Sequence, residues 1–337
     1  MRTLSASLES AQKELSARPI WKVVLSRASA TTLGYDQTRI TKISHLETPT
    51  SYLAEITLRN SDTILTALDF EHYQAVISYG YATGTSRSAW VASSTYAIDD
   101  MVIPTPANTN GYQYRCSIAG TAGSAEPTWP TDLGVTVASS AATFEMDGST
   151  GEEYSRVAPL RVRAQELHSG RGILRCVLRA EGILNQLAED KAEASSTLTG
   201  GDTQTVKTLL TAVAGTSLIP YKNYTGYTVT YDSEDTLIDT FQPKDFFSIR
   251  INEDRLDKLQ ELLDYTGCKM RTQNDGNIHI QDPTISGTAY NYEYKFNVSG
   301  DHNFWSKSVR NRFVNPNKEV VKSHPDLEAP HYSGSAI

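Results

Sequence analysis

A weakly charged stretch over residues 90–148 constrains the fold of this 337-residue chain more than any other feature. Charged residues are scarce there, whereas Gly, Ser, Thr, Pro and large aromatic residues are frequent. Aromatic segments alternate with turn signals such as Asn110-Gly111 and Pro127, which is typical of short strands joined by tight turns. The pattern predicts a small all-β module over residues 88–149, set into a domain of a different kind.

Residues on both sides of this module alternate between apolar and polar side chains. The alternation covers five ranges: 21–26, 51–60, 73–81, 158–167 and 172–182. A period of two is the mark of antiparallel strands with one buried face. We therefore expect residues 20–87 and 150–199 to form one discontinuous domain, a β-barrel that the module interrupts.

Helical patterns occur at the N-terminus and in the second half of the chain. Apolar spacing predicts a helix over residues 4–17, within an N-terminal segment 1–19. Asp202 is the predicted N-cap of a further helix, and Gly215 is its predicted stop.

A helix followed by a hairpin is the clearest local unit, over residues 252–283. Asn252 is expected to cap the helix, and Gly267 is expected to end it in the left-handed conformation. A turn at Asn274-Asp275-Gly276 should then join two strands.

These elements predict a mainly β protein with some α structure, of the α+β class. It would comprise two β-barrel-like domains, the small all-β insert and an α-plus-hairpin subdomain over residues 200–288. Residues 289–337 would supply strands of the second barrel, whose completeness the sequence leaves open.

Composition excludes several classes of protein. The formal net charge is −8 and the pI is about 5.4, which argues against nucleic-acid binding. Three cysteines, far apart and odd in number, argue against a disulfide scaffold or a cysteine zinc site. The N-terminus shows no signal peptide and no run reaches the length of a membrane span, so we expect assembly in the cytoplasm.

No motif of a catalytic kind occurs in the sequence. Phosphate-binding glycine loops, HExxH and GxSxG are absent, and the seven histidines are scattered without metal-ligand spacing. Adjacent carboxylates such as Asp99-Asp100 are interpreted as solvated turns. A Ser-His-Asp site assembled by the fold stays open, but the prediction is a protein that is not an enzyme and needs no cofactor and no metal.

The aromatic residues of the insert are its one binding-type constellation. An aromatic ring can stack on the C–H face of a sugar, but a small module also needs aromatic side chains for its own core. Trp90, Tyr96, Tyr114 and Phe144 are therefore predicted to be structural. Tyr112 and Trp129 lie in turn-like segments and are the candidate carbohydrate-binding residues, with a core role as the alternative.

The insert resembles the carbohydrate-binding-like modules of phage tail and baseplate proteins over about 55 residues. The matching positions are Trp90, Tyr96, Asp100, Val102, Pro104, Asn110-Gly111, Tyr114, Cys116, Ala119-Gly120-Thr121, Gly123, Glu126-Pro127, Trp129-Pro130 and Gly134 with Thr136-Val137. The sequence departs from the pattern at its end, because Phe144 precedes Asp147-Gly148 where an aromatic residue should follow that pair.

The rest of the chain resembles trimeric baseplate hub proteins of phage tails. The resemblance is carried by residues 11–26, 171–187, 252–283 and 301–326. It implies two barrel-like domains per subunit and three subunits in a pseudo-sixfold ring, between a hexameric tail tube and a threefold tip. The implied partners are two further subunits, the tail tube or distal tail protein, the tape measure protein and the tip, spike or fibre proteins.

The resemblance also implies a location and a role for the charge. The protein would belong to the virion, in the tail baseplate, where it forms part of the DNA ejection conduit. An acidic lining would let DNA pass through the lumen without binding. The insert would contact host-surface glycan or a neighbouring baseplate protein. The alternatives are a secreted glycan-active enzyme with a binding module, and a hexameric distal-tail or adaptor ring protein.

Overall fold

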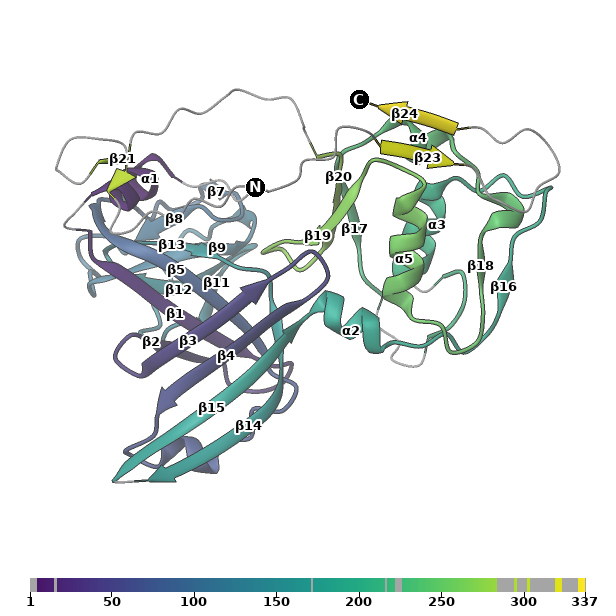
Figure 1. Ribbon diagram of the computed structural model, residues 1–337. Coiled ribbons are helices and arrows are strands. Elements are labelled where there is room, and N and C mark those ends of the chain that lie inside the picture. The colour runs from purple at the N-terminus through teal and green to yellow at the C-terminus, as the bar shows by residue number, and fades with distance from the viewer. Residues whose placement is uncertain are drawn as a thin grey trace. The chain divides into compact units, whose positions relative to one another are not determined.

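The computed structural model describes residues 5–14, 17–170, 172–215, 217–221 and 226–283, and beyond them the backbone of four short strands (Figure 1). The chain divides into two compact units, residues 1–289 and residues 290–337. The protein is mainly β with few helices, as the sequence predicts. Among the described residues, no helix is both long and apolar enough to cross a membrane.

An eight-stranded antiparallel sheet is the largest element of the first unit. Its strands run in the order β2-β1-β5-β14-β15-β4-β3, and β13 pairs with β5 beside this path. The strands are β1 Pro19–Ser26, β2 Leu33–Asp36, β3 Ile40–Glu47, β4 Tyr52–Arg59, β5 Gln74–Thr85, β13 Gly151–Arg156, β14 Leu160–Gly170 and β15 Ile173–Gly182. Strands that precede and follow the insert thus belong to one sheet.

The sheet curls back on itself. Its two edge strands, β2 and β3, are consecutive in the chain and only residues 37–39 separate them. A connection of this length spans at most roughly 14 Å, so the two edges must lie close together. The two edge strands share no ladder of hydrogen bonds.

Alternate residues of these strands form the main hydrophobic core. Val23, Leu25, Ile56, Leu58 and Ile77 are fully buried on the inner side. Burial of each such side chain stabilises the fold by about 1.5–3 kcal/mol. A 3-10 turn, η1 Ile64–Ala67, closes one end of this core.

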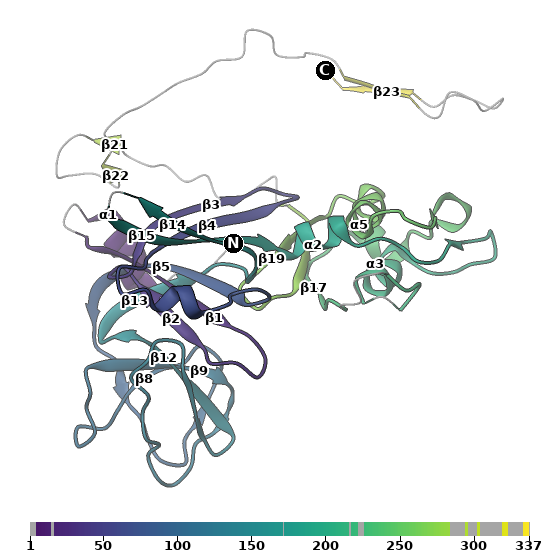
Figure 2. The same ribbon diagram turned by 90° about the horizontal axis from the view of Figure 1, so that it is seen from below.

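The insert forms a separate module with its own core (Figure 2). Its main sheet has the order β11-β12-β9-β8-β6, and β10 pairs with β7. The strands are β6 Ser88–Ala89, β7 Thr95–Tyr96, β8 Met101–Ile103, β9 Tyr112–Ile118, β10 Gly120–Thr121, β11 Thr136–Ser139 and β12 Ala142–Ser149. The module begins directly after β5 and ends directly before β13, two strands that pair with each other.

An α/β region follows the sheet. Its helices pack on a three-stranded sheet of order β17-β20-β19, in which β17 runs parallel to β20. The elements are α2 Ile183–Glu189, β16 Ser196–Thr197, α3 Val206–Ala214, β17 Val229–Ser233, α4 Thr236–Thr240, η2 Lys244–Phe246, β18 Ser248–Ile249, α5 Arg255–Asp264, β19 Lys269–Thr272 and β20 Ile278–Gln281. The hairpin predicted around Asn274-Asp275-Gly276 is confirmed by the β19–β20 pairing.

Two predicted helix caps are wrong by two or three residues. Helix α3 is capped by Thr205, because the side chain of Asp202 accepts hydrogen bonds from Thr199 instead. Helix α5 is capped by Asp254, because Asn252 has a positive φ of 67° and lies in the preceding turn.

Of the two predicted helix stops, Gly267 is wrong and Gly215 is confirmed. Helix α5 ends at Asp264, and its C-cap is Tyr265, two residues before Gly267, in a right-handed conformation. Gly215 does cap the end of α3, also in a right-handed conformation.

The N-terminal helix is shorter than predicted. Helix α1 covers Ala6–Lys13, and its N-cap is Ser5, whose hydroxyl accepts from the Leu8 N–H. Leu8 and Ala11 are its buried residues.

The second unit is described only as two strand pairs. Strand β21 Tyr294–Lys295 runs parallel to β22 His302–Asn303, and β23 Glu319–Lys322 is antiparallel to β24 Ser333–Ala336. The remaining residues predicted as strands of a second barrel, including most of 301–326, lie outside the described residues.

Candidate functional site at the root of the insert

One row of polar residues crosses the outer face of the large sheet where the insert meets it. Lys22 of β1 is opposite Ser78 of β5, and Ser78 is opposite Arg156 of β13. The next residues along β1 and β5, Val23 and Ile77, point into the core, so the row faces the other way. Lys22 is nevertheless fully buried, because the insert covers this part of the sheet.

The insert meets this row with charged residues of its own sheet. The Lys22 ammonium lies 2.7 Å from Oδ1 of Asp147 and also donates to the Asp147 carbonyl. The Arg156 guanidinium lies 2.6 Å from Oε1 of Glu145, and Arg115 lies 2.7 Å from Oε2 of the same carboxylate. Five side chains from four strands thus form one continuous network of opposite charges, here called the root cluster.

The environment of the root cluster determines its protonation. Burial acts to raise the pKa of Asp147, but the positive charges of Lys22 and Arg156 outweigh burial and hold that pKa below its ordinary value. Burial lowers the pKa of Lys22 against the opposing attraction of Asp147. Removing one partner of such a buried pair is strongly destabilising, because it leaves an uncompensated charge away from water. The root cluster therefore ties the insert to the sheet in one orientation.

Two glycines allow the backbones to approach closely at the same boundary. A Cβ atom at Gly34 would lie 2.3 Å from the carbonyl oxygen of Leu133 in the insert. Gly134, with φ of +80°, lies so near Val24 that a Cβ would be 2.5 Å from its Cγ1. The contact between the insert and strands β1 and β2 is thus tight as well as charged.

A second buried carboxylate, Glu153, attaches the N-terminal helix beside the root cluster. The hydroxyls of Ser5 and Ser7 donate to its Oε2 over 2.7 Å and 2.9 Å, and Arg87 pairs with its Oε1. Burial acts to raise the pKa of Glu153, but these hydrogen bonds and the Arg87 charge hold it below its usual range.

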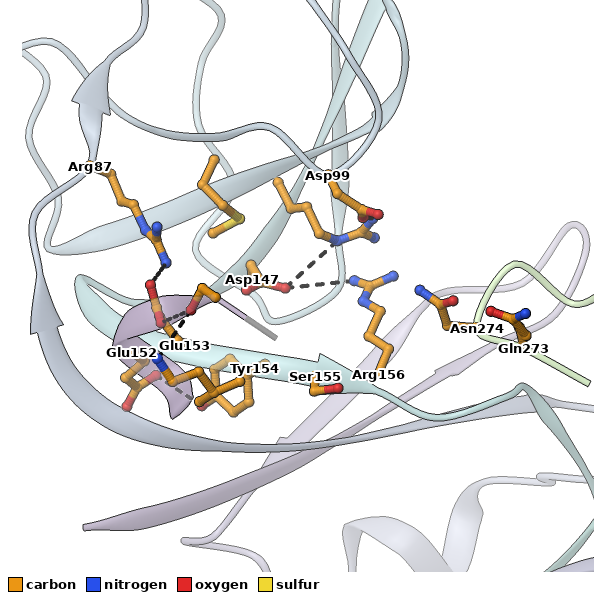
Figure 3. A pocket seen from close by; sticks show the side chains of 14 residues that line it. Arg87, Asp99, Asp147, Glu152, Glu153, Tyr154, Ser155, Arg156, Gln273 and Asn274 are labelled. Atoms are coloured by element: carbon orange, nitrogen blue, oxygen red, sulfur yellow. Dashed lines mark hydrogen bonds and ion pairs between the residues drawn. The ribbon is translucent and has the colours of Figure 1, made fainter. Parts of the chain in front are cut away.

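A polar cavity of about 470 Å³ lies between these groups (Figure 3). Figure 3 shows Asp147 joined to two guanidinium groups, one of them that of Arg156, and Arg87 facing Glu153. The residues that line the cavity are Ser5, Leu8, Arg87, Asp99, Met101, Arg115, Asp147, Glu152, Glu153, Tyr154, Ser155, Arg156, Gln273 and Asn274. The Nε atom of Arg115 lies 3.8 Å from Oδ1 of Asp147, so the guanidinium of Arg115 contacts both carboxylates of the root cluster.

The chemistry available at this site is electrostatic positioning. The acidic and basic groups pair with one another, and the lining residues include no nucleophile beside a histidine base. Across the described part of the chain, no group of three or more His, Cys, Asp or Glu residues could hold a metal ion.

The aromatic residues of the insert lie on the opposite side of its sheet. Tyr114 and Phe144 are fully buried, Trp90 and Tyr96 are buried, and Trp129 is only 8% exposed. The Trp129 ring lies 4.3 Å from that of Tyr114, between centroids, and its Nε1 donates to Glu126 over 2.8 Å.

Trp129 therefore lies in the core cluster of the insert. Tyr112 is partly buried and packs against the edge of the same core. Carbohydrate binding through Tyr112 and Trp129 stays a prediction.

No pattern in the sequence marks the residues of the root cluster as a site. Lys22 lies within an otherwise apolar strand, and an isolated lysine there was one available signal. In the sequence, Asp147 stands out only as part of the closing Asp147-Gly148 pair of the insert. The two are 125 residues apart, so no local pattern joins them.

No protein-family model matches the chain, and no curated protein matches it. Among solved structures, it is similar to the tail protein from Neisseria meningitidis MC58, with a TM-score of 0.45 and 9% identity over 91% of this chain and 60% of that one. The 43 kDa tail protein of prophage MuSo2 from Shewanella oneidensis gives a TM-score of 0.36 and 11% identity over 77% and 54%.

The Francisella PdpA-VgrG complex gives a TM-score of 0.37 and 7% identity over 85% and 32%. The chain thus spans 60% or less of the length of these three proteins.

Proposed function

We propose that the chain is a structural subunit of a phage tail baseplate hub, which joins a hexameric tail tube to a threefold tip. One observation supports this proposal above the others. A module with the sequence pattern of phage tail proteins is set between two paired strands of one sheet and fastened there by buried ion pairs. This arrangement suits a part that must hold its shape within an assembly.

The root cluster gives the insert a mechanical role in this proposal. The insert leaves the sheet at Thr85 and returns at Gly151, which pair directly. It would project from the ring as a fixed arm and contact host-surface glycan, with Tyr112 and Trp129 as the aromatic candidates, or a neighbouring baseplate protein.

The proposed assembly is a homotrimer in the virion tail baseplate, assembled in the host cytoplasm. It would contact the tail tube or distal tail protein, the tape measure protein and the tip, spike or fibre proteins. DNA would pass through its lumen without specific binding, since the net charge of −8 repels a polyanion. The role is structural, not enzymatic, and requires no cofactor.

Sedimentation equilibrium of the full chain, followed by electron microscopy of the particles, tests the proposal. We expect threefold rings, and we expect a variant with residues 88–149 replaced by a short Gly-Ser linker to lose density at their outer surface. Sixfold rings would favour a distal-tail or adaptor protein. A stable monomer that cleaves polysaccharide would overturn the proposal in favour of a glycan-active enzyme.

A further inference from the structure

Two arginines oppose each other on the outer face of the large sheet. Arg59 of β4 is the direct cross-strand neighbour of Arg175 of β15, and His168 of β14 is the next in the same row. The adjacent residues Leu58 and Cys176 are fully buried, so both arginines point away from the core, and both are exposed. Residues opposite one another in this way have Cβ atoms roughly 5 Å apart.

Some of the other charges on this face are paired with charges of opposite sign. Lys42 lies 3.2 Å from Glu55, and Arg179 bridges to Glu166 over 3.1 Å. In the part of the chain that the structure describes, neither Arg59 nor Arg175 lies within ion-pair distance of a carboxylate. Like charges directly opposite each other destabilise a sheet, so this basic row is unfavourable in the isolated subunit.

Helix α5 carries a row of acidic residues on its exposed side. Asp257, Glu261 and Asp264 recur at spacings of four and three, which places them on one side of the helix. The buried leucines of α5 occupy the other side, and Asp257 and Asp264 are exposed.

The acidic stripe of α5 is only partly neutralised. Glu261 pairs with Lys258 over 2.8 Å, whereas among the described residues no cation pairs with Asp257 or Asp264. Carboxylates four residues apart on a helix repel each other, so this stripe is also unfavourable when it stands alone.

The net charge of the α/β region is negative, whereas that of the large sheet is slightly positive. Residues 183–283 contain sixteen acidic and nine basic residues, whereas residues 20–87 and 150–182 together contain twelve basic and ten acidic ones. The acidic excess of the chain therefore lies outside the large sheet. The sheet and the α/β region of two different copies would attract each other at long range.

We infer that the basic row of Arg59 and Arg175 docks against the acidic stripe of α5 in a second copy of this chain. The inference rests on the proposed trimer and names the surfaces that hold it together. No ion pair joins the two surfaces within the described residues of one chain, so the complement of each is supplied by a neighbour. A contact between two different surfaces is head-to-tail, and it closes into a ring when repeated by a threefold rotation.

Charge reversal tests the contact, with the dissociation constant of the oligomer measured by analytical ultracentrifugation at low salt. We expect R59E/R175E and D257K/D264K each to weaken association at least tenfold. Contacts between the two variants are complementary, but mixing them should not restore a closed trimer, because a ring of three subunits cannot alternate two kinds of subunit and keeps one repulsive contact. Combining all four substitutions in one chain should return the constant to within about threefold of the wild type.

Arg161→Glu is the matched control. Arg161 is exposed on β14, but its cross-strand neighbour is Glu181, so its reversal should leave association unchanged. Circular dichroism checks that every variant is folded, and all the altered side chains lie at the surface. Association of the wild type should also weaken as salt rises, since salt screens exposed charges.

The outcomes separate the two proposals. A wild-type chain that stays monomeric would overturn the trimeric hub and this contact with it. A wild-type trimer that both double reversals leave unchanged would overturn the contact alone and assign the basic row to a different acidic partner. Loss of association without recovery in the fourfold variant would also count against direct pairing.

Discussion

The two faces of the insert's main sheet are packed by opposite kinds of side chain. One face carries Tyr114 and Phe144, whose rings contact Trp129 and Tyr96 in a closed aromatic core. The other face carries Arg115, Glu145 and Asp147, which meet Lys22 and Arg156 of the large sheet.

The difference separates stability from orientation. Apolar burial is non-directional, so the aromatic face holds the module together without specifying where it points. Ion pairs and hydrogen bonds depend on geometry, so the root cluster specifies how the insert sits on the sheet. Variants on the two faces should therefore differ in kind as well as in size.

The largest effect is expected on the aromatic face. Trp129→Ala should lower the free energy of unfolding of the insert by about 3–5 kcal/mol, because it removes a buried ring and the Glu126 hydrogen bond. Urea denaturation followed by the fluorescence of the remaining tryptophans measures it. A variant that keeps the stability of the wild type would show that Trp129 is not a core residue.

The second largest effect on stability is expected in the root cluster. Lys22→Met leaves Asp147 buried with its main partner removed, which should cost about 3 kcal/mol. The insert should stay folded but loosen from the sheet, so limited proteolysis should cut faster near residues 86–88 and 149–151. Lys42→Met, which removes an exposed lysine from β3, is the matched control. Cleavage within the insert instead would contradict the division between the two faces.

Acid should lower the stability of the insert's aromatic core, because Glu126 becomes protonated. Burial acts to raise its pKa, but hydrogen bonds from Thr105, Trp129 and Asn108 prevail and lower it from 4.5 to about 2. A lowered pKa contributes stability that is complete above about pH 4.5 and is lost as the pH falls through about 2. Glu126→Gln should cost about 1–2 kcal/mol at pH 7 and flatten this dependence in urea titrations at stepped pH.

Asp132→Asn is the control for the pH experiment, since Asp132 is an exposed carboxylate of the same module. It should leave the slope between pH 4.5 and 2 unchanged. If Glu126→Gln keeps the wild-type slope, another carboxylate must be responsible for the acid sensitivity.

The smallest effect is expected at the N-terminal helix. Ser5→Ala removes both the helix cap and one hydrogen bond to Glu153, whereas Ser7→Ala removes only a hydrogen bond. Ser5→Ala should cost about 1 kcal/mol and Ser7→Ala less. Hydrogen exchange of the α1 amides should speed up in the same order. Equal exchange in both variants would show that the cap contributes nothing.

Much of the fold was predictable because the relevant patterns are local. Alternation in residues 21–26 and 51–60 gave strands, and Asn274-Asp275-Gly276 gave the hairpin turn. The caps at Asp202 and Asn252 were misplaced, because the first accepts hydrogen bonds within a turn and the second adopts a left-handed conformation. Such short polar residues serve turns as readily as helix starts.

The aromatic residues show where local inference stops. Composition predicted that Tyr114 and Phe144 form a core, and both are fully buried. The turn-like surroundings of Trp129 leave two interpretations open, and the packing of its ring against Tyr114, which supports a core role, could not be inferred from the sequence.

The sequence by itself determined the mainly β class, the alternating strands and an insert with an aromatic core, because strand periodicity and turn chemistry act over a few residues. The tertiary structure alone decided that Lys22 and Asp147 meet, that Glu153 receives Ser5 and that Arg59 opposes Arg175. The physical reason is that charge pairing depends on distance in space. Residues far apart in the chain become neighbours only when the sheets have formed.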